Sequence, residues 1–193
     1  MKIKICCVDE DGRYGGPQSR MIDIYRGINK QKFDYYFLIP NNVKIFRDKL
    51  LKINAKFYEA DIYRLSSNII LALKYIFFFP FEIIFLVNFF KEKKFNLIQI
   101  NGVPHFKTLL AAKLSNIKSV WIIEDSYSPR SITLVFRFLV KILNPNIIYI
   151  SKKVKNFYFN KIDTEMSNLF KIMSPTDTSF FKRKKKIKTK NLI

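Results

Sequence analysis

The fold is decided by residues 3–30, which read IKICCVDEDGRYGGPQSRMIDIYRGINK. The run from Ile3 to Val8 is typical of a buried strand, and a loop containing Gly15 and Gly16 follows it. Apolar residues then recur at helical spacing, at Met21, Ile24, Tyr25 and Ile28. Gly16 can cap this helix, and Pro17 suits its first position because an N–H there would have no partner in the helix. The stretch therefore predicts a strand-loop-helix unit.

The rest of the chain repeats this alternation of short apolar runs and longer helical patterns. Several short runs are rich in Ile, Val, Phe and Tyr, as strands buried on both faces are. We predict strands at residues 3–8, 34–39, 55–58, 97–100, 119–123, 147–150 and 169–173. We predict helices at residues 17–30, 43–52, 106–114 and 132–143. This order predicts an α/β, Rossmann-like parallel sheet with helices on both faces.

The apolar segment 69–90 departs from that pattern. Lys74, Glu82 and Asn88 interrupt it and Pro80 lies near its middle, so no uninterrupted apolar run reaches the roughly 18 residues that a membrane span needs. We expect a kinked pair of helices, either buried in the core or at an interface. Contact with a membrane surface is the alternative, and a true span is the third.

The composition restricts the class of protein. The chain has 193 residues and 49% of them are hydrophobic, which predicts one compact domain rather than a disordered chain. The formal net charge of +20 raises the question of nucleic acid as a partner. Because the basic residues are spread over most predicted surfaces, we expect no nucleic acid. A basic face toward anionic lipid or a phosphorylated acceptor fits better.

Cysteine usage and the N-terminus indicate the compartment. Cys6 and Cys7 are neighbours in a predicted strand, so they point to opposite faces and indicate neither a disulfide nor a metal site. The first residues lack the apolar stretch and cleavage site of a signal peptide. We expect a cytoplasmic protein, at the inner face of the membrane if its basic surface meets anionic lipid. We expect no metal and no cofactor.

The loop between the first strand and the first helix is a candidate anion site. Glycine lets the backbone approach a ligand, and a helix N-terminus offers free N–H groups and a positive dipole end to phosphate. The spacing differs from the dinucleotide-binding pattern G-x-G-x-x-G. A simple turn into the helix is therefore the alternative.

Five segments carry a resemblance when they are taken in order. They are GRYGG at 12–16, NLIQING at 96–102, VWIIEDSYSPR at 120–130, IYISKKV at 148–154 and SPTDTSFF at 174–181. The first resembles the glycine-rich first loop of family 4 glycosyltransferases. The others resemble that family's D-h-h-H-h-N-G, V-V-W-H-L-H-D-x-x-S-P-R, h-h-x-h-S-x-x-V and N-G-V-D-x-x-x-F segments, where h is an apolar residue. The similarity covers nearly the whole chain.

The resemblance implies the N-terminal, acceptor-side half of a two-domain GT-B enzyme. Residues 1–181 would form this domain, and residues 182–193 would form a basic linker and the start of a C-terminal donor domain. The implied activity is a retaining transfer of a sugar from a nucleotide donor, which is a substrate, to a glycan or lipid-linked acceptor. In the family the first-loop glycines lie near the donor diphosphate, which assigns Gly15 and Gly16.

The catalytic assignments follow from the third segment. The family's functional histidine position is taken here by Glu124, and the next residue, Asp125, is retained. A carboxylate can orient a sugar hydroxyl or act as a base, although it is no neutral donor. We assign Asn101, His105 and Arg130 to acceptor binding. The alternatives are a structural role for His105 and a pair between Arg130 and Asp125.

The expected donor domain is absent from the sequence. One half cannot enclose donor and acceptor in the cleft that catalysis needs, so we expect this polypeptide to be inactive by itself. The donor domain would be lost through a split or truncated coding region, or a separate chain would supply it. A stand-alone acceptor-binding module and a peripheral membrane protein are the rival functions. Whether the chain is an enzyme stays open at this point.

Overall fold

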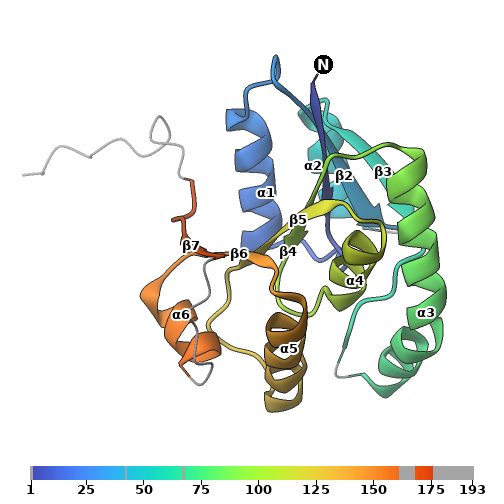
Figure 1. The fold of residues 1–193 in the computed structure, drawn as a ribbon. Coiled ribbons are helices and arrows are strands. Elements are labelled where there is room, and N and C mark those ends of the chain that lie inside the picture. Colours follow the sequence, from blue (N-terminus) through green and yellow to red (C-terminus); the bar gives the residue numbers. More distant parts are fainter. Residues whose placement is uncertain (1, 42, 67, 161–167, 176–193) are drawn as a thin grey trace, which may run out of the picture.

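The computed structural model describes residues 2–41, 43–66, 68–160 and 168–175. In this part of the chain, parallel strands form one sheet in the order β3-β2-β1-β4-β5-β6-β7 (Figure 1). The strands are β1 (Ile3–Val8), β2 (Phe33–Pro40), β3 (Lys56–Ala60), β4 (Leu97–Asn101), β5 (Lys118–Ile123), β6 (Asn146–Tyr149) and β7 (Leu169–Lys171). The helices are α1 (Gly16–Gly27), α2 (Lys44–Lys52), α3 (Ile69–Glu92), α4 (Phe106–Leu114), α5 (Arg130–Leu143) and α6 (Lys152–Phe159). The predicted fold class is confirmed.

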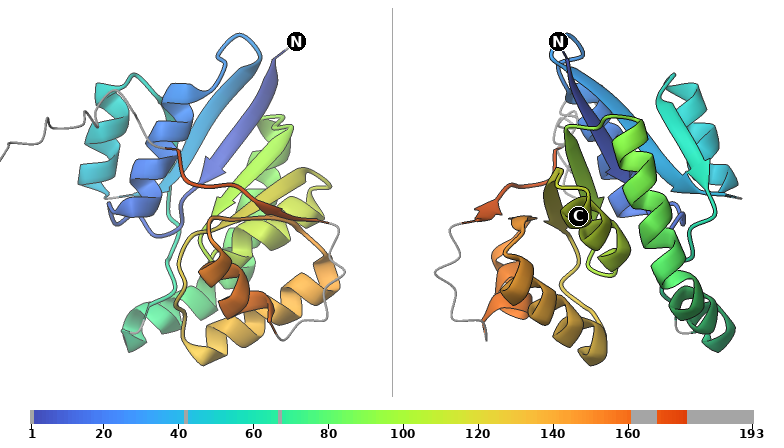
Figure 2. Two further views of the ribbon diagram at one scale, coloured as in Figure 1. Left: turned by 90° about the vertical axis from the view of Figure 1, so that its left-hand side faces the viewer. Right: turned by 45° about the vertical axis from the view of Figure 1, so that its right-hand side comes forward.

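Helices cover both faces of the sheet, because successive side chains of a strand point to opposite faces. Cys7 of β1 belongs to the apolar cluster under α1 and α2, and Cys6 belongs to the cluster under α3, α4, α5 and α6. Figures 1 and 2 show α1 on one side of the sheet and α3 and α4 on the other. The two neighbouring cysteines therefore lie in separate halves of the core, as the strand pattern predicted.

The bounds of the predicted strands and helices agree to within two residues except at the end of α1, and α6 was not among the predicted helices. Helix α1 ends at Gly27, not at residue 30, because Ile28 has an extended backbone. The Asn29 side chain then accepts hydrogen bonds from the backbone N–H groups of Gln31 and Lys32, which forms a turn into β2. The predicted boundary at residue 181 and the linker at 182–193 lie outside the described residues.

The apolar segment forms one continuous helix of 24 residues, α3, so the predicted pair of helices is wrong. Pro80 lies inside it and removes one backbone donor without ending it. Only 17% of its most apolar 18-residue window is buried, which overturns the expectation of a core helix, although the helix is long and apolar enough to cross a membrane. We call its exposed apolar side chains the α3 apolar face: Ile69, Ile70, Leu73, Ile76, Phe77, Phe78, Phe81, Ile84 and Phe85.

Candidate functional site

The predicted site residues lie at or after the carboxyl ends of β1, β4 and β5, which meet at one edge of the sheet. β1 and β4 are paired neighbours, although β2, β3 and α3 separate them in the sequence. The chain therefore leaves these two strands toward opposite sides of the sheet. Such a switch point opens a crevice beyond the strand ends, where ligands of open parallel sheets bind.

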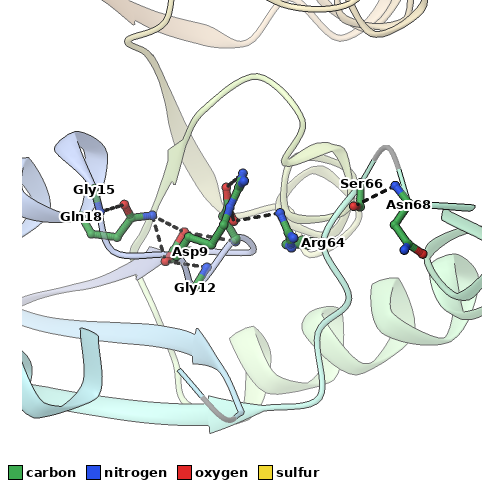
Figure 3. Close-up of polar contacts among 9 residues, drawn as sticks. Asp9, Gly12, Gly15, Gln18, Arg64, Ser66 and Asn68 are labelled. Carbon is green, nitrogen blue, oxygen red and sulfur yellow. Dashed lines mark hydrogen bonds and ion pairs between the residues drawn. The ribbon is translucent and has the colours of Figure 1, made fainter. Parts of the chain in front are cut away.

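The Asp9 side chain fixes the backbone of the first loop, between β1 and α1. Its buried carboxylate accepts hydrogen bonds from the backbone N–H groups of Asp11 at 3.2 Å and Gly12 at 3.1 Å, and from the Gln18 side-chain amide (Figure 3). Burial raises the pKa of the Asp9 carboxyl, and His105 and these hydrogen bonds partly offset the effect. Gly12 has a φ of +72°, and a side chain there would collide with Val43. The loop therefore has one well-determined path into α1.

The two predicted diphosphate glycines lie at the start of α1. Gly15 is the N-cap residue and its N–H donates to the Gln18 side-chain oxygen at 3.0 Å. Gly16 is the first helical residue, and a Cβ added there would meet no atom within 4 Å. The first turn of α1 carries no acidic residue. The space above Gly16 and the positive end of the helix dipole are thus open to an anionic group.

A buried cluster of charges joins the end of β1 to two helices, and we call it the Glu10 cluster. Glu10 accepts hydrogen bonds from the backbone N–H and the hydroxyl of Thr108, at the start of α4. Lys107 Nζ lies 3.4 Å from the second Glu10 oxygen, donates to Glu82 of α3 and to the Tyr63 carbonyl, and lies 4.4 Å from the centre of the Tyr75 ring. The cluster therefore ties α3 and α4 to the site edge.

Asn101 is the last residue of β4, His105 follows the strand, and both are buried. The Asn101 amide group donates to Cys7 Sγ and to the Val8 carbonyl, and its oxygen accepts from Gln99. These bonds fix β4 to β1, so the acceptor-binding role of Asn101 stays a prediction. The side chain of His105, by contrast, has an Nδ1 without a hydrogen-bond partner in the described part of the chain.

Glu124 follows β5 and faces Arg20 of α1. Arg20 Nη1 lies 3.4 Å from Glu124 Oε1, and the two side chains are 6% and 10% exposed. Burial raises the pKa of Glu124, the Arg20 charge opposes this, and Asp125 adds to it. Within the described ranges, Arg20 Nε, Arg20 Nη1 and Glu124 Oε1 make no hydrogen bond. This pair therefore has capacity for further polar contacts.

Two further exposed site residues follow β5, one in the segment before α5 and one at the start of that helix. Asp125 is exposed, and Arg130 is the exposed first residue of α5. Among the residues that the structure describes, no ion pair joins them, so the alternative that Arg130 pairs with Asp125 is not supported. Arg130 is thus available to a ligand.

A groove of about 1110 Å³ lies beside this edge, between the segment before α3 and the helices α3, α4 and α5. Most of its wall is apolar and includes Phe79, Leu110 and Leu139. Arg13 of the first loop and Arg64 of the segment before α3 also line it. Sequence reasoning missed the groove, because its walls come from four separate segments.

The sequence interpretation also missed Asp9, Gln18 and Arg20. An Asp directly after a buried strand and before a glycine-rich loop is a signal that was available for Asp9. Gln18 and Arg20 had no comparable signal, since their partners Asp9 and Glu124 come from other elements. In the described ranges, no group of His, Cys, Asp or Glu side chains is arranged to hold a metal ion. The chemistry that the site offers is binding of an anion and proton exchange at a buried carboxyl.

Solved structures of other proteins share the fold of this chain. No protein-family profile matches the sequence, and no curated protein matches it. A glycosyltransferase from Rickettsia africae matches the structure with a TM-score of 0.66 and 14% identity, over 89% of this chain and 43% of its own. MurG from Acinetobacter baumannii matches with a TM-score of 0.60 and 14% identity, over 92% and 47%. UDP-GlcNAc 2-epimerase from Neisseria meningitidis, bound to UDP-GlcNAc, matches with a TM-score of 0.58 and 15% identity, over 89% and 46%.

The chain therefore spans less than half the length of each of these proteins. Its fold is that of the N-terminal, Rossmann-like half of a GT-B protein. At identities of this level the likeness concerns the fold alone.

Proposed function

We propose that this chain is the acceptor-side half of a retaining glycosyltransferase of the family 4 type. It works with a donor-binding half to move a sugar from a nucleotide donor to a glycan or lipid-linked acceptor, and it is inactive without that half. The observation that carries the proposal is the convergence at one sheet edge of the open α1 N-terminus, the unpartnered His105 nitrogen and the Arg20–Glu124 pair. Three structural neighbours support the proposal. One is a glycosyltransferase, one is MurG, and the third, a UDP-GlcNAc 2-epimerase, has a nucleotide sugar bound.

In this proposal each part of the edge has one task. The start of α1 at Gly15 and Gly16 faces the donor diphosphate, which the helix dipole attracts. Glu124 and Asp125 orient the attacking hydroxyl, and burial raises the pKa of Glu124, which makes this carboxyl a stronger base than an exposed one. His105 and Arg130 contact the acceptor. The donor sugar is a substrate, and the proposed chemistry needs no cofactor.

The test is transfer of labelled sugar by this chain together with a donor-binding half. Polypeptides encoded next to the gene for this chain are tested as the donor-binding half, and each nucleotide sugar is assayed in turn. We expect transfer from at least one donor when both halves are present, none with either half alone, and a loss of about 100-fold for Glu124→Gln. Asp48→Asn, an exposed carboxyl on α2, is the matched control and should keep full activity. Full transfer by Glu124→Gln would contradict the assignment.

A second function, contact with the membrane surface, is favoured by the α3 apolar face. Exposed apolar area of this extent marks an interaction surface in soluble proteins. The basic balance of the chain suits anionic lipid, and we place the protein in the cytoplasm at the inner face of the membrane. The two buried free cysteines are compatible with that reducing compartment.

Flotation with phosphatidylglycerol vesicles and with phosphatidylcholine vesicles tests this contact. We expect binding to the anionic vesicles that falls with salt and is lost when Phe77 and Phe81, 67% and 60% exposed, are both changed to Ser. Phe79 is unsuitable for this test because it packs against the core. Ile45→Ser, at an exposed apolar residue of α2 on the opposite side of the sheet, is the control. Equal binding by the double variant would remove α3 from the contact.

A further inference from the structure

The groove beside the candidate site has one charged end. Asp11 accepts two hydrogen bonds from Arg13, at 2.6 and 2.7 Å, and lies 3.6 Å from Arg64 Nη1. Burial of the Asp11 carboxyl raises its pKa, but Arg13 and Arg64 together outweigh this and hold the pKa below its ordinary value. Two guanidinium groups thus lie at this end of the groove and share the Asp11 carboxylate.

Arg64 has free donors. Its separation from Asp11 is that of an ion pair and not of a hydrogen bond, and it makes no hydrogen bond in the part of the chain that the structure describes. Figure 3 shows Arg64 reaching from the segment before α3 toward the first loop, with the α3 N-cap residue Asn68 beyond it. A guanidinium in this position can bind two oxygens of a phosphate.

The rest of the groove is apolar and opens onto exposed apolar surface. Its wall includes Ile76 of α3 and Val135 and Phe138 of α5, which are 66%, 45% and 63% exposed. Ile76 also belongs to the α3 apolar face. An apolar chain in the groove would therefore bury these side chains and could continue directly onto that face.

We propose that the groove binds a lipid monophosphate, with the apolar chain between α3, α4 and α5 and the phosphate on Arg64 and Arg13. The proposal rests on the proposed function and gives its acceptor class, a sugar or sugar precursor carried on a lipid phosphate. Arg13 belongs to the first loop. The same loop contains Gly12, whose N–H donates to Asp9, and Gly15, the N-cap residue of α1. The phosphate would thus lie beside the edge where the sugar is transferred.

The single tryptophan provides a direct readout of binding. Trp121 is buried, and its ring centre lies 6.1 Å from that of Phe106, which lines the groove. Dodecyl phosphate is titrated into the full chain below its micelle concentration, with dodecanol and inorganic phosphate as separate probes. We expect a saturable change in Trp121 emission with dodecyl phosphate, weaker binding of dodecanol and no effect of inorganic phosphate.

Three variants test the two ends of the groove. Arg64→Gln should weaken dodecyl phosphate about tenfold and leave dodecanol unchanged, because only a charge-assisted contact is lost. Val135→Gln should weaken both chain-bearing probes about fivefold, since it removes apolar area from the wall. Leu134→Gln is its matched control, being 56% exposed on the same helix but outside the groove. All of these side chains are exposed or half-exposed, so the variants should fold.

Several outcomes would overturn the proposal. Inorganic phosphate that competes as strongly as dodecyl phosphate would indicate a simple anion site. Equal loss in Leu134→Gln and Val135→Gln would indicate non-specific adsorption to exposed apolar surface, and unchanged binding in Arg64→Gln would remove the phosphate contact. The titration needs neither nucleotide sugar nor donor half. Sugar transfer to a soluble acceptor without dodecyl phosphate binding would therefore contradict only the groove, and binding without any transfer would contradict only the proposed catalysis.

Discussion

Two buried ion pairs lie at the same edge of the sheet and differ in how far their neighbours satisfy them. In the Glu10 cluster, one Glu10 oxygen has two hydrogen bonds from Thr108, and Lys107 donates to Glu82 and Tyr63. Two oxygens at the cluster lack a hydrogen bond in the described ranges: Glu10 Oε2, which faces Lys107, and the hydroxyl of Tyr75, whose ring contacts Lys107.

The Arg20–Glu124 pair is slightly more exposed, at 6% and 10%, and both partners keep atoms without hydrogen bonds in the described part of the chain. Leaving a buried polar group without a partner costs free energy, and such groups in a native protein call for an explanation. We infer from this difference that the Glu10 cluster stabilises the fold, and we propose that the Arg20–Glu124 pair contacts a ligand. Three changes test this division.

The largest effect is expected for Lys107→Met. It leaves Glu10 and Glu82 buried without their shared cation, which should lower the free energy of unfolding by about 3–5 kcal/mol. Urea unfolding followed by circular dichroism measures this. Lys113→Met, at an exposed lysine of the same helix, should change stability by less than about 0.5 kcal/mol. If Lys107→Met lowers the free energy of unfolding no more than Lys113→Met does, the Glu10 cluster does not stabilise the fold.

A smaller effect on stability is expected for Arg20→Met. The change leaves the Glu124 carboxyl without its cation, but it also removes two donors that had no hydrogen-bond partner, so we expect a loss of about 1–3 kcal/mol. Its effect on sugar transfer in the two-half assay should be larger than that of Lys107→Met, when both are measured well below their unfolding temperatures. Arg26→Met, 60% exposed on the same helix, is the control. The division fails if Arg20→Met destabilises the protein more than Lys107→Met does.

The smallest effect is a change in the pH dependence of stability. Burial raises the folded-state pKa of Glu124 above its unfolded value, so the carboxylate costs stability at neutral pH. This cost disappears as the pH falls through the folded pKa toward the ordinary value of about 4.3, because the folded state then binds the proton more tightly.

The glutamine in Glu124→Gln does not titrate, so this variant lacks the pH-dependent contribution of the Glu124 carboxyl to stability. Relative to the variant, the natural protein should therefore gain stability as the pH falls from neutral, by about 1.4 kcal/mol for each unit of pKa elevation. Urea unfolding of both proteins at a series of pH values gives the difference. A difference that is independent of pH, or that grows in the opposite direction, would show that Arg20 outweighs burial at this carboxyl.

Most of the sheet could be predicted because its strands are local runs of apolar residues. The run at Ile3–Val8 and the turn at Asn144-Pro145 mark their elements through nearest neighbours alone. The segment of α3 was misjudged because hydropathy does not distinguish a buried helix from an exposed one. Pro80 was given too much weight, since one missing donor does not end a long helix.

The site was only partly predictable for the same physical reason. Gly15, Gly16, Glu124 and His105 stand after strands or at helix starts, and such positions can be recognised from the order of elements. Arg20 and Lys107 lie inside helices and resemble any other basic residue in the sequence. Their burial follows from carboxylates that are 104 positions away in one case and 97 in the other.

The sequence alone determined the alternation of strands and helices, the class of the fold and the loops at which a site would lie. Each of these follows from side-chain periodicity and from the backbone preferences of Gly and Pro, which act over a few residues. The tertiary structure alone decided which charges are buried in pairs, which face of α3 remains exposed and where the groove opens. These properties depend on contacts between segments far apart in the chain, and only the packed sheet brings those segments together.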